Sequence, residues 1–212
     1  PPRATSSAAS DVYKRQYQQS AKVTPDRLAK DPRNSLLSRG ARFRLSAEII
    51  RDQALATSGL LTQKLGGPSV MPPQPPGVWK STYSGEKWKD ATGPDRYRRG
   101  LYTYLKRTSP YPALTTFDAG SGEVCQIRRI RTNTPLQALI TLNDTTFLEA
   151  AGALSKKMRS LEHGFRLVLI RSPLRKELVR LQALYSTMEK HYENNVKAAE
   201  NLLKSAGLSE GN

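Results

Sequence analysis

The densest group of polar side chains with chemical potential lies between residues 106 and 144. Arginine guanidinium groups are planar forks of donors that match the oxygens of carboxylate, sulfate and phosphate groups. One carboxylate of the group, Asp118, follows Phe117 in a Gly-rich stretch, and loops of this kind often carry site residues. The sequence therefore predicts a polar site made of Arg107, Asp118, Arg128, Arg131, Asn133, Asn143 and Asp144.

The same arginines have a structural alternative. They can tie loops to helix ends by donating to backbone carbonyls, and a buried polar network and a ligand site look alike in sequence. Both interpretations stay open at this point.

A second candidate group is Arg44, Glu48 and Asp52, spaced by four residues. On a helix these three side chains would share one face. Two carboxylates beside an arginine can form an edge for general acid/base chemistry or for a metal ion. The favoured alternative is a ladder of salt bridges along the helix.

The chain contains no C-x-x-C-H, H-E-x-x-H, G-x-G-x-x-G or Walker-type sequence. Its single cysteine, Cys125, has no histidine near it in sequence, so we expect a buried and inert thiol. His163 and His191 are expected at the surface, because a metal site needs three or four converging ligands. We therefore expect no metal or cofactor site in this chain.

Three aromatic residues, Trp79, Tyr83 and Trp88, alternate with lysines in a long loop. Such side chains can stack on sugar rings or bases. We favour the interpretation that they attach the loop to the core.

The chain is strongly basic. It has 34 Lys and Arg against 18 Asp and Glu, a formal net charge of +16, and a mean hydropathy of −0.58. This balance suits an acidic glycan, nucleic acid or an anionic membrane surface as a partner, with a merely solvated basic surface as the alternative. No recognised nucleic-acid module is visible, so nucleic acid is the least favoured partner. No run approaches the ~18 apolar residues of a membrane helix, and residues 1–16 lack the apolar stretch expected of a signal peptide.

Local signals predict several helices. Thr24-Pro25-Asp26 starts a short helix that Asp31-Pro32 ends, and Thr134 with Gln137 forms a capping box. A helix is also predicted where apolar residues recur at helical spacing or where Asn143-Asp144 provides a new cap. The predicted ranges are 45–61 with Ser46 as the cap, 134–142, 146–160, Ser172-Pro173 to about 192, and 196–206 ended by Gly207.

The segments between these helices are irregular. Residues 68–77 are Pro-rich, residues 78–100 and 108–126 read as loops, Leu101–Leu105 fits a short strand or a helical turn, and 165–170 is an apolar segment of undecided structure. The predicted fold is mainly α, an irregular helical domain with long Pro/Gly-rich loops and at most a small β element. It has a helical part over 17–66, a loop-rich part over 67–133 and a helical part over 134–206.

Residues 6–16 (SSAASDVYKRQ) are identical to the translation of a transposase-type sequencing adapter. The segment is small and polar and has no apolar period to bury. We expect residues 1–16 to be a non-native tail and 17–212 to be part of a single domain.

Several runs in the chain occur in the order that is typical of one protein family, and the chain resembles the domain of unknown function 1553 of planctomycete, verrucomicrobial and related bacterial proteins. The resemblance covers about Tyr17 to Tyr192, and its most specific part is RTNTPLQALITLND. The runs that carry it are QSAKVTPDRLAKDPRNSLL (19–37), RFRLSAEIIRDQALA (42–56), GGPSV (66–70), YTYLKRTSP (102–110), TFD (116–118) and RTNTPLQALITLND (131–144).

The resemblance implies a setting. In that family the domain follows a cytochrome-c-like domain and another uncharacterised domain in one exported polypeptide of the bacterial envelope. Haem c is thus expected in a separate upstream domain, and the chain is expected to be a fragment that stops before the closing helix. We expect an accessory or interaction domain that binds anionic polysaccharide. The alternative is the catalytic domain of a haem-coupled oxidoreductase or of a polysaccharide-processing enzyme.

Overall fold

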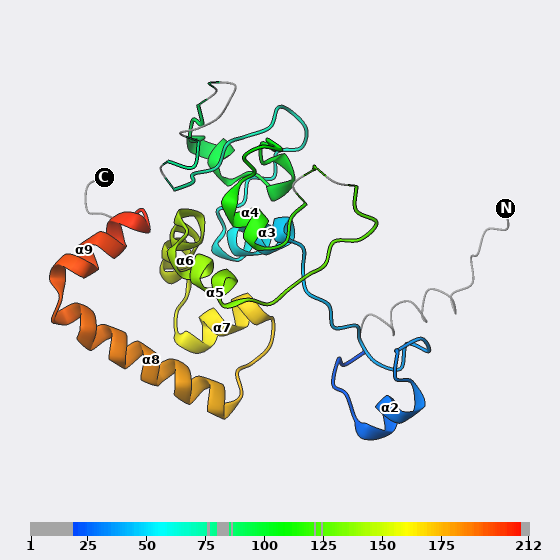
Figure 1. Ribbon diagram of the computed structural model, residues 1–212. Helices are drawn as coiled ribbons and strands as arrows, with labels where there is room; N and C mark the ends of the chain where they lie inside the picture. Colours follow the sequence, from blue (N-terminus) through cyan, green and yellow to red (C-terminus); the bar gives the residue numbers. More distant parts are fainter. Residues whose placement is uncertain are drawn as a thin grey trace. The chain divides into compact units, whose positions relative to one another are not determined.

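The computed structural model describes residues 19–75, 77–79, 85, 87–120, 122–123 and 125–208 (Figure 1). The chain forms two compact units, Pro1–Arg44 and Leu45–Asn212. The division falls inside the stretch predicted as the helical part 17–66.

The described part of the first unit contains the predicted short helix, α2, over Pro25–Lys30. The Thr24 hydroxyl accepts a hydrogen bond from the Arg27 amide at 3.4 Å. After the helix, the Asp31 carboxylate accepts from the amides of Ser35 (2.7 Å) and Leu36 (3.0 Å). Asp31 therefore both ends α2 and holds the turn that follows.

Helix α3 opens the second unit and spans Ala47–Ser58, so it is shorter than the predicted 45–61. Gly59 ends it with φ of 87°, a left-handed conformation that glycine adopts at little cost. The same boundaries correct the grouping of Arg44 with Glu48 and Asp52, because Arg44 precedes the helix and cannot share its face.

The C-terminal helices follow the local signals. Helix α5 spans Pro135–Asn143 and α6 spans Thr145–Lys157. The Asp144 carboxylate caps α6 by accepting from the Thr146 amide at 3.0 Å. The long helix α8 over Arg175–Glu193 and α9 over Val196–Ser205 also lie where the sequence predicts them.

Two helices were not predicted. Helix α7, Leu161–Leu169, includes most of the undecided apolar segment, and the Ser160 hydroxyl caps it by accepting from the His163 amide at 3.1 Å. Helix α4, Pro112–Thr116, is a single short turn inside a stretch predicted to be irregular. It begins with proline at its first position, a common helix start.

The middle of the second unit is made of loops with short 3₁₀ turns, η1 over Gly93–Tyr97 and η2 over Gly100–Tyr102. The β structure of the described residues consists of isolated bridges, Thr62 with Arg98 and Val70 with Thr103. The segment Leu101–Leu105 thus belongs partly to a helical turn and partly to a bridge. The fold is mainly α, as predicted.

The core of the second unit forms around α3. Helix α6 packs along it, η2 and α4 also lie against it, and α5 packs on α6 (Figure 1). Leu55 of α3 is fully buried. Gly100 of η2 approaches the α3 backbone so closely that a Cβ there would lie 2.9 Å from the Glu48 Cα, so only glycine fits. This contact places η2 beside the first turn of α3.

The aromatic residues attach the long loop to this core, as the favoured interpretation predicted. Trp88 stacks on Tyr111 with ring centroids 5.8 Å apart, and Trp79 meets Trp88 edge-on at 5.1 Å. The Trp88 indole also donates to the Pro72 carbonyl at 2.8 Å. Tyr83 lies outside the described residues. Among the helices described, none has the length and apolar character needed to cross a membrane.

Candidate functional site

An arginine of α3 stands at the centre of the second unit. Arg51 is 3% exposed, and its guanidinium donates to the carbonyls of Arg98 (2.7 Å) and Arg96 (3.0 Å). Burial lowers the pKa of Arg51. Burial also raises the pKa of Tyr111 to about 12, and that of Asp144 above its ordinary value. The interior of this unit is therefore unfavourable to charge, and Arg51 compensates by bonding to backbone.

The cavity beside Arg51 is too small for a substrate. Its volume is about 10 Å³, close to the space of one water molecule. Asp144 and Tyr111 lie in its wall, and the Tyr111 hydroxyl donates to the carbonyl of Pro73, which does not line the cavity, at 2.8 Å. This group therefore acts as part of the core.

Arg98 is even more buried, at 1% exposed. Its guanidinium donates to the carbonyl oxygens of Pro68 (2.9 Å) and Gly66, and lies 3.8 Å from the centre of the Tyr102 ring. It thereby fixes the Gly-Gly-Pro turn to the 3₁₀ segment. The structural role foreseen for arginines is filled by Arg98 and Arg51, neither of which was among the candidate residues.

The two carboxylates of α3 have partners far away in sequence. The Glu48 carboxylate accepts from the Arg129 guanidinium at 2.6 Å. The Asp52 carboxylate accepts from the Gly100 amide at 2.6 Å and from Arg99 at 3.2 Å. Both side chains therefore connect α3 to other segments.

Asp118 closes a loop. It has a left-handed backbone with φ of 64°. Its carboxylate accepts from the Thr132 amide at 2.6 Å, from the Thr132 hydroxyl at 2.9 Å and from the Gln137 amide group at 3.3 Å. Gln137 is 2% exposed and also donates to the Thr116 carbonyl at 2.9 Å. These bonds join the two ends of the segment between residues 119 and 131, here named the basic loop.

Asn143 and Asp144 are not brought to this loop. Asn143 is exposed and donates to the Leu139 carbonyl of its own helix at 2.8 Å. Asp144 caps α6 and lines the small cavity beside Arg51. The predicted seven-residue site is thus divided, with these two residues serving helix ends.

The remaining candidates lie at or near the basic loop. Arg107, Arg128, Arg131 and Asn133 are exposed. The loop borders a pocket of about 230 Å³ and a wider, shallow hollow of about 720 Å³, and the two share Ala119 and Gly120 in their walls. Arg129 with Glu48 lines the pocket, and Arg128 with Asp118 lines the hollow. We name the pocket and the hollow together the loop site.

The pocket is built from several elements. The first turn of α3, the 3₁₀ turn η2 and helix α4 supply its sides, with Tyr104 and Leu105 between them. Burial acts to raise the pKa of Glu48, but hydrogen bonds, above all the one from Arg129, outweigh it and leave that pKa below its usual value. Glu48 is therefore an anion that holds Arg129 at the edge of the pocket.

Cys125 is exposed, which corrects the expectation of a buried thiol. It begins a stretch of the basic loop that lies at the surface, where Ile127 and Ile130 are almost fully accessible as well. Burial of this cysteine depended on tertiary packing that the loop does not make.

The histidines do not form a metal centre with their neighbours. His191 is exposed, and the half-buried His163 accepts a hydrogen bond at Nδ1 from the Arg159 amide at 3.1 Å. Within the described ranges, no three His, Cys, Asp or Glu side chains gather as a metal site would require. The lone Cys125 also cannot provide the two thioether bonds of a haem c attachment sequence.

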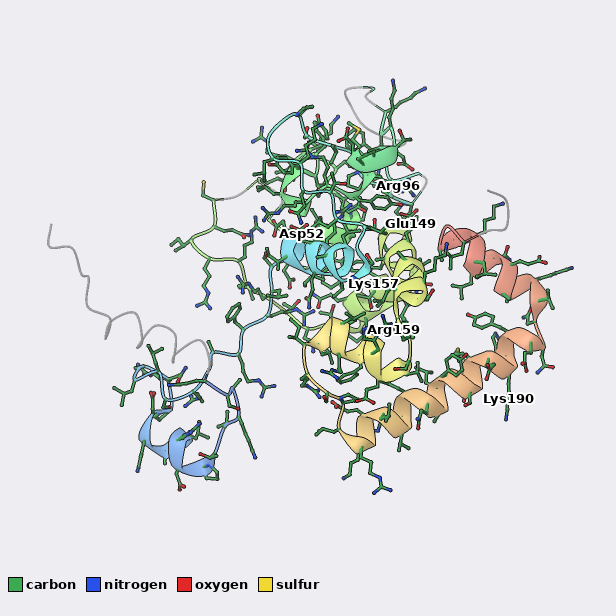
Figure 2. All side chains as sticks on the ribbon, turned by 180° about the vertical axis from the view of Figure 1, so that it is seen from behind. Asp52, Arg96, Glu149, Lys157, Arg159 and Lys190 are labelled. Atoms are coloured by element: carbon green, nitrogen blue, oxygen red, sulfur yellow. The ribbon has the colours of Figure 1, made fainter. Side chains whose placement is uncertain are left out.

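One ion pair was not foreseen. Arg96 of η1 and Glu149 of α6 point toward one another (Figure 2), and the Arg96 Nε donates to the Glu149 carboxylate at 3.1 Å. The hydrogen bond to Glu149 raises the pKa of Arg96. This pair joins the loop-rich segment to α6 on the same unit as the loop site.

The fold and the site define a small basic helical domain with an arginine-lined loop. The family described as a protein of unknown function (DUF1553) matches residues 12–185, and the chain belongs to this family. The match agrees with the resemblance carried by the runs quoted above. No curated protein and no solved structure matches the chain.

Proposed function

We propose that this domain is an accessory module that binds anionic polysaccharide at the loop site. The observation that carries the proposal is the placement of two neighbouring arginines of the basic loop. Arg128 lines the hollow, and Arg129 lines the adjoining pocket. Guanidinium groups bind sulfate and carboxylate oxygens through paired hydrogen bonds. A chain of charged sugars could therefore occupy the pocket and the hollow together.

The walls of the pocket suit part of a sugar chain. Tyr104, Leu105 and Pro110 provide apolar surface, and Arg129 and Glu48 provide polar groups at one side. Its volume of about 230 Å³ is below the ~300–1,000 Å³ typical of sites for drug-sized ligands. It therefore fits a single ring or a substituent better than a long segment.

An accessory role is favoured over a catalytic one by the partners of the carboxylates. Glu48 is engaged by Arg129, Asp52 by the Gly100 amide, and Asp118 by Thr132. Each bond holds two segments together. A general acid or base would need to give up such a bond in order to transfer a proton.

The setting of the domain is also proposed. The resemblance supports an exported multidomain protein of the bacterial envelope with haem c in an upstream domain. Because this chain has a single cysteine, we assign the covalent attachment of haem to that other domain. A haem stain of the whole polypeptide in which this domain occurs tests this, and a polypeptide without covalent haem would contradict it.

Binding is tested by titrating the chain with dextran sulfate and with neutral dextran. We expect affinity for the sulfated polymer that falls as salt is raised, and none for dextran. The variant Arg107→Ser, Arg128→Ser should weaken this binding about tenfold or more, since each guanidinium supplies a charge-assisted bond.

The matched control is Lys197→Ser, Lys204→Ser on α9, which removes the same charge from exposed positions. It should change the affinity much less. Equal losses in the two double variants would show that only net charge attracts the polymer, and equal binding of neutral dextran would contradict the role of the arginines.

A further inference from the structure

Helix α8 has an apolar seam without a buried residue. The helix runs along one side of the second unit and packs against its neighbours α7 and α9 (orange in Figure 1). Apolar residues alternate at spacings of four and three residues, the pattern of a coiled-coil seam. The seam consists of Leu174, Leu178, Leu181, Tyr185, Met188 and Tyr192.

Three residues of this seam, Leu178, Leu181 and Tyr192, are half-buried, and the other three are exposed. Leu174 is 66% exposed, Tyr185 is 53% exposed and Met188 is 41% exposed. Leu184, which flanks the seam, is 56% exposed. A row of large apolar side chains at coiled-coil spacing marks an interaction surface, because water-exposed apolar area is stabilised by covering it.

We infer that α8 pairs with α8 of a second copy of this chain, in antiparallel orientation. A two-fold axis level with Ala183 brings every seam residue opposite another seam residue. The resulting layers are Leu174 with Tyr192, Leu178 with Met188, and Leu181 with Tyr185, each formed twice. Such a contact is isologous and closes as a dimer.

The sizes of the side chains favour this register. Each layer combines a leucine with a longer side chain, so large and small residues alternate across the seam. A parallel pairing in register would instead place Tyr185 against Tyr185 and Tyr192 against Tyr192. Leu184 lies close to the proposed axis, where Leu184 of the second copy would cover it.

The charges favour the same orientation. The first half of α8 carries Arg175, Lys176 and Arg180 with one carboxylate, whereas the second half carries Glu189 and Glu193 with one lysine. Antiparallel pairing places the basic half against the acidic half and brings Arg175 beside Glu189. Parallel pairing would place the two basic halves together, which is unfavourable.

The first test is sedimentation equilibrium of the full chain from micromolar to several hundred micromolar concentration. We expect a monomer–dimer equilibrium. Met188→Lys should weaken dimerisation about tenfold or more, because it places a charge in the seam. Ala183→Lys adds the same charge on the opposite face of the helix and should leave dimerisation nearly unchanged.

A loss of folding is not expected to cause the difference in dimerisation between the two variants. No residue of α8 is buried, so both lysine variants should keep the helical circular dichroism and the unfolding midpoint of the parent chain. A chain that stays monomeric throughout the concentration range overturns the inference. Equal dimerisation of the two lysine variants overturns it as well.

The orientation is tested by disulfide trapping in a Cys125→Ser background. Proteins with Leu178→Cys and Met188→Cys should cross-link when mixed and oxidised, since these positions face each other. Each protein alone should not, because identical positions lie about 15 Å apart along the axis, from ten residues at 1.5 Å each, too far for a disulfide. Cross-linking of each protein with itself would show a parallel pair and contradict the register.

Discussion

Arginines have different surroundings in the interior of the second unit and in its basic loop. Arg51 and Arg98 are nearly inaccessible, and their guanidinium groups bond to backbone carbonyls. Arg128 is exposed beside a hollow. A buried guanidinium is tolerated only when fixed acceptors replace water, whereas an exposed one keeps donors available to a ligand. The surroundings of an arginine therefore decide whether it stabilises the fold or recognises a partner.

The largest effect is expected from Arg98→Ala. The change removes the donors to Pro68 and Gly66 and leaves those carbonyls without them, so the free energy of unfolding should fall by about 4 kcal/mol. Denaturant unfolding measures this. Arg128→Ala is the matched control and should change the free energy by no more than about 0.5 kcal/mol. Similar values for the two variants would erase the distinction between the two regions.

A second comparison sets the core against helix α8. Leu55→Ala removes a fully buried side chain and should destabilise the chain by about 3 kcal/mol, within the ~2–5 kcal/mol seen for such changes. Val179→Ala on α8 removes a side chain that is 56% exposed and should have a much smaller effect. The same unfolding experiment tests both, at a concentration where the chain is monomeric. Comparable losses would mean that α8 contributes to the core.

Gln137→Leu tests the closure of the basic loop. The change removes the bonds to the Thr116 carbonyl and to Asp118, and should reduce the free energy of unfolding by about 2 kcal/mol. It should also speed cleavage of the loop by trypsin under native conditions, because the loop contains several arginines. If cleavage stays as slow as in the parent chain, Gln137 does not hold the loop.

The smallest effect is a change in pH dependence. Burial raises the pKa of Asp144 above its ordinary value of 3.8. Its contribution to stability is therefore present below about pH 3.8 and is lost as the pH rises through the folded-state pKa. Asp144→Asn keeps a good helix cap but does not titrate. The difference in unfolding free energy, parent minus variant, should decrease across this range, and a constant or increasing difference would contradict the burial of this carboxylate.

The sequence predicted those parts of the fold that depend on neighbouring residues. Thr24 with Pro25 located α2, and Asp144 located the start of α6, because a cap acts within one helical turn. Gly59 was overlooked as a helix end, since an apolar pattern continued beyond it to Leu61. Helix α7 was not assigned although Ser160 provides a cap, because the apolar segment behind it was short.

The candidate site was predicted only in part, for a similar reason. Asp118 was predicted as a site residue in a Gly-rich stretch, but its partners Thr132 and Gln137 come from later in the chain. No local pattern separates the buried Arg51 and Arg98 from the exposed arginines, since burial depends on which segments pack over them. Cys125 was wrongly predicted to be buried for the same reason, and it is exposed.

The central claim is that Arg107 and Arg128, which are exposed at the basic loop, recognise a ligand and do not hold the fold. The most direct test measures, on one preparation of the Arg107→Ser, Arg128→Ser variant, both its affinity for dextran sulfate and its unfolding midpoint. The account predicts that the affinity falls about tenfold or more while the midpoint stays that of the parent chain. Unchanged affinity, or a loss of affinity accompanied by a large fall in the midpoint, would contradict it.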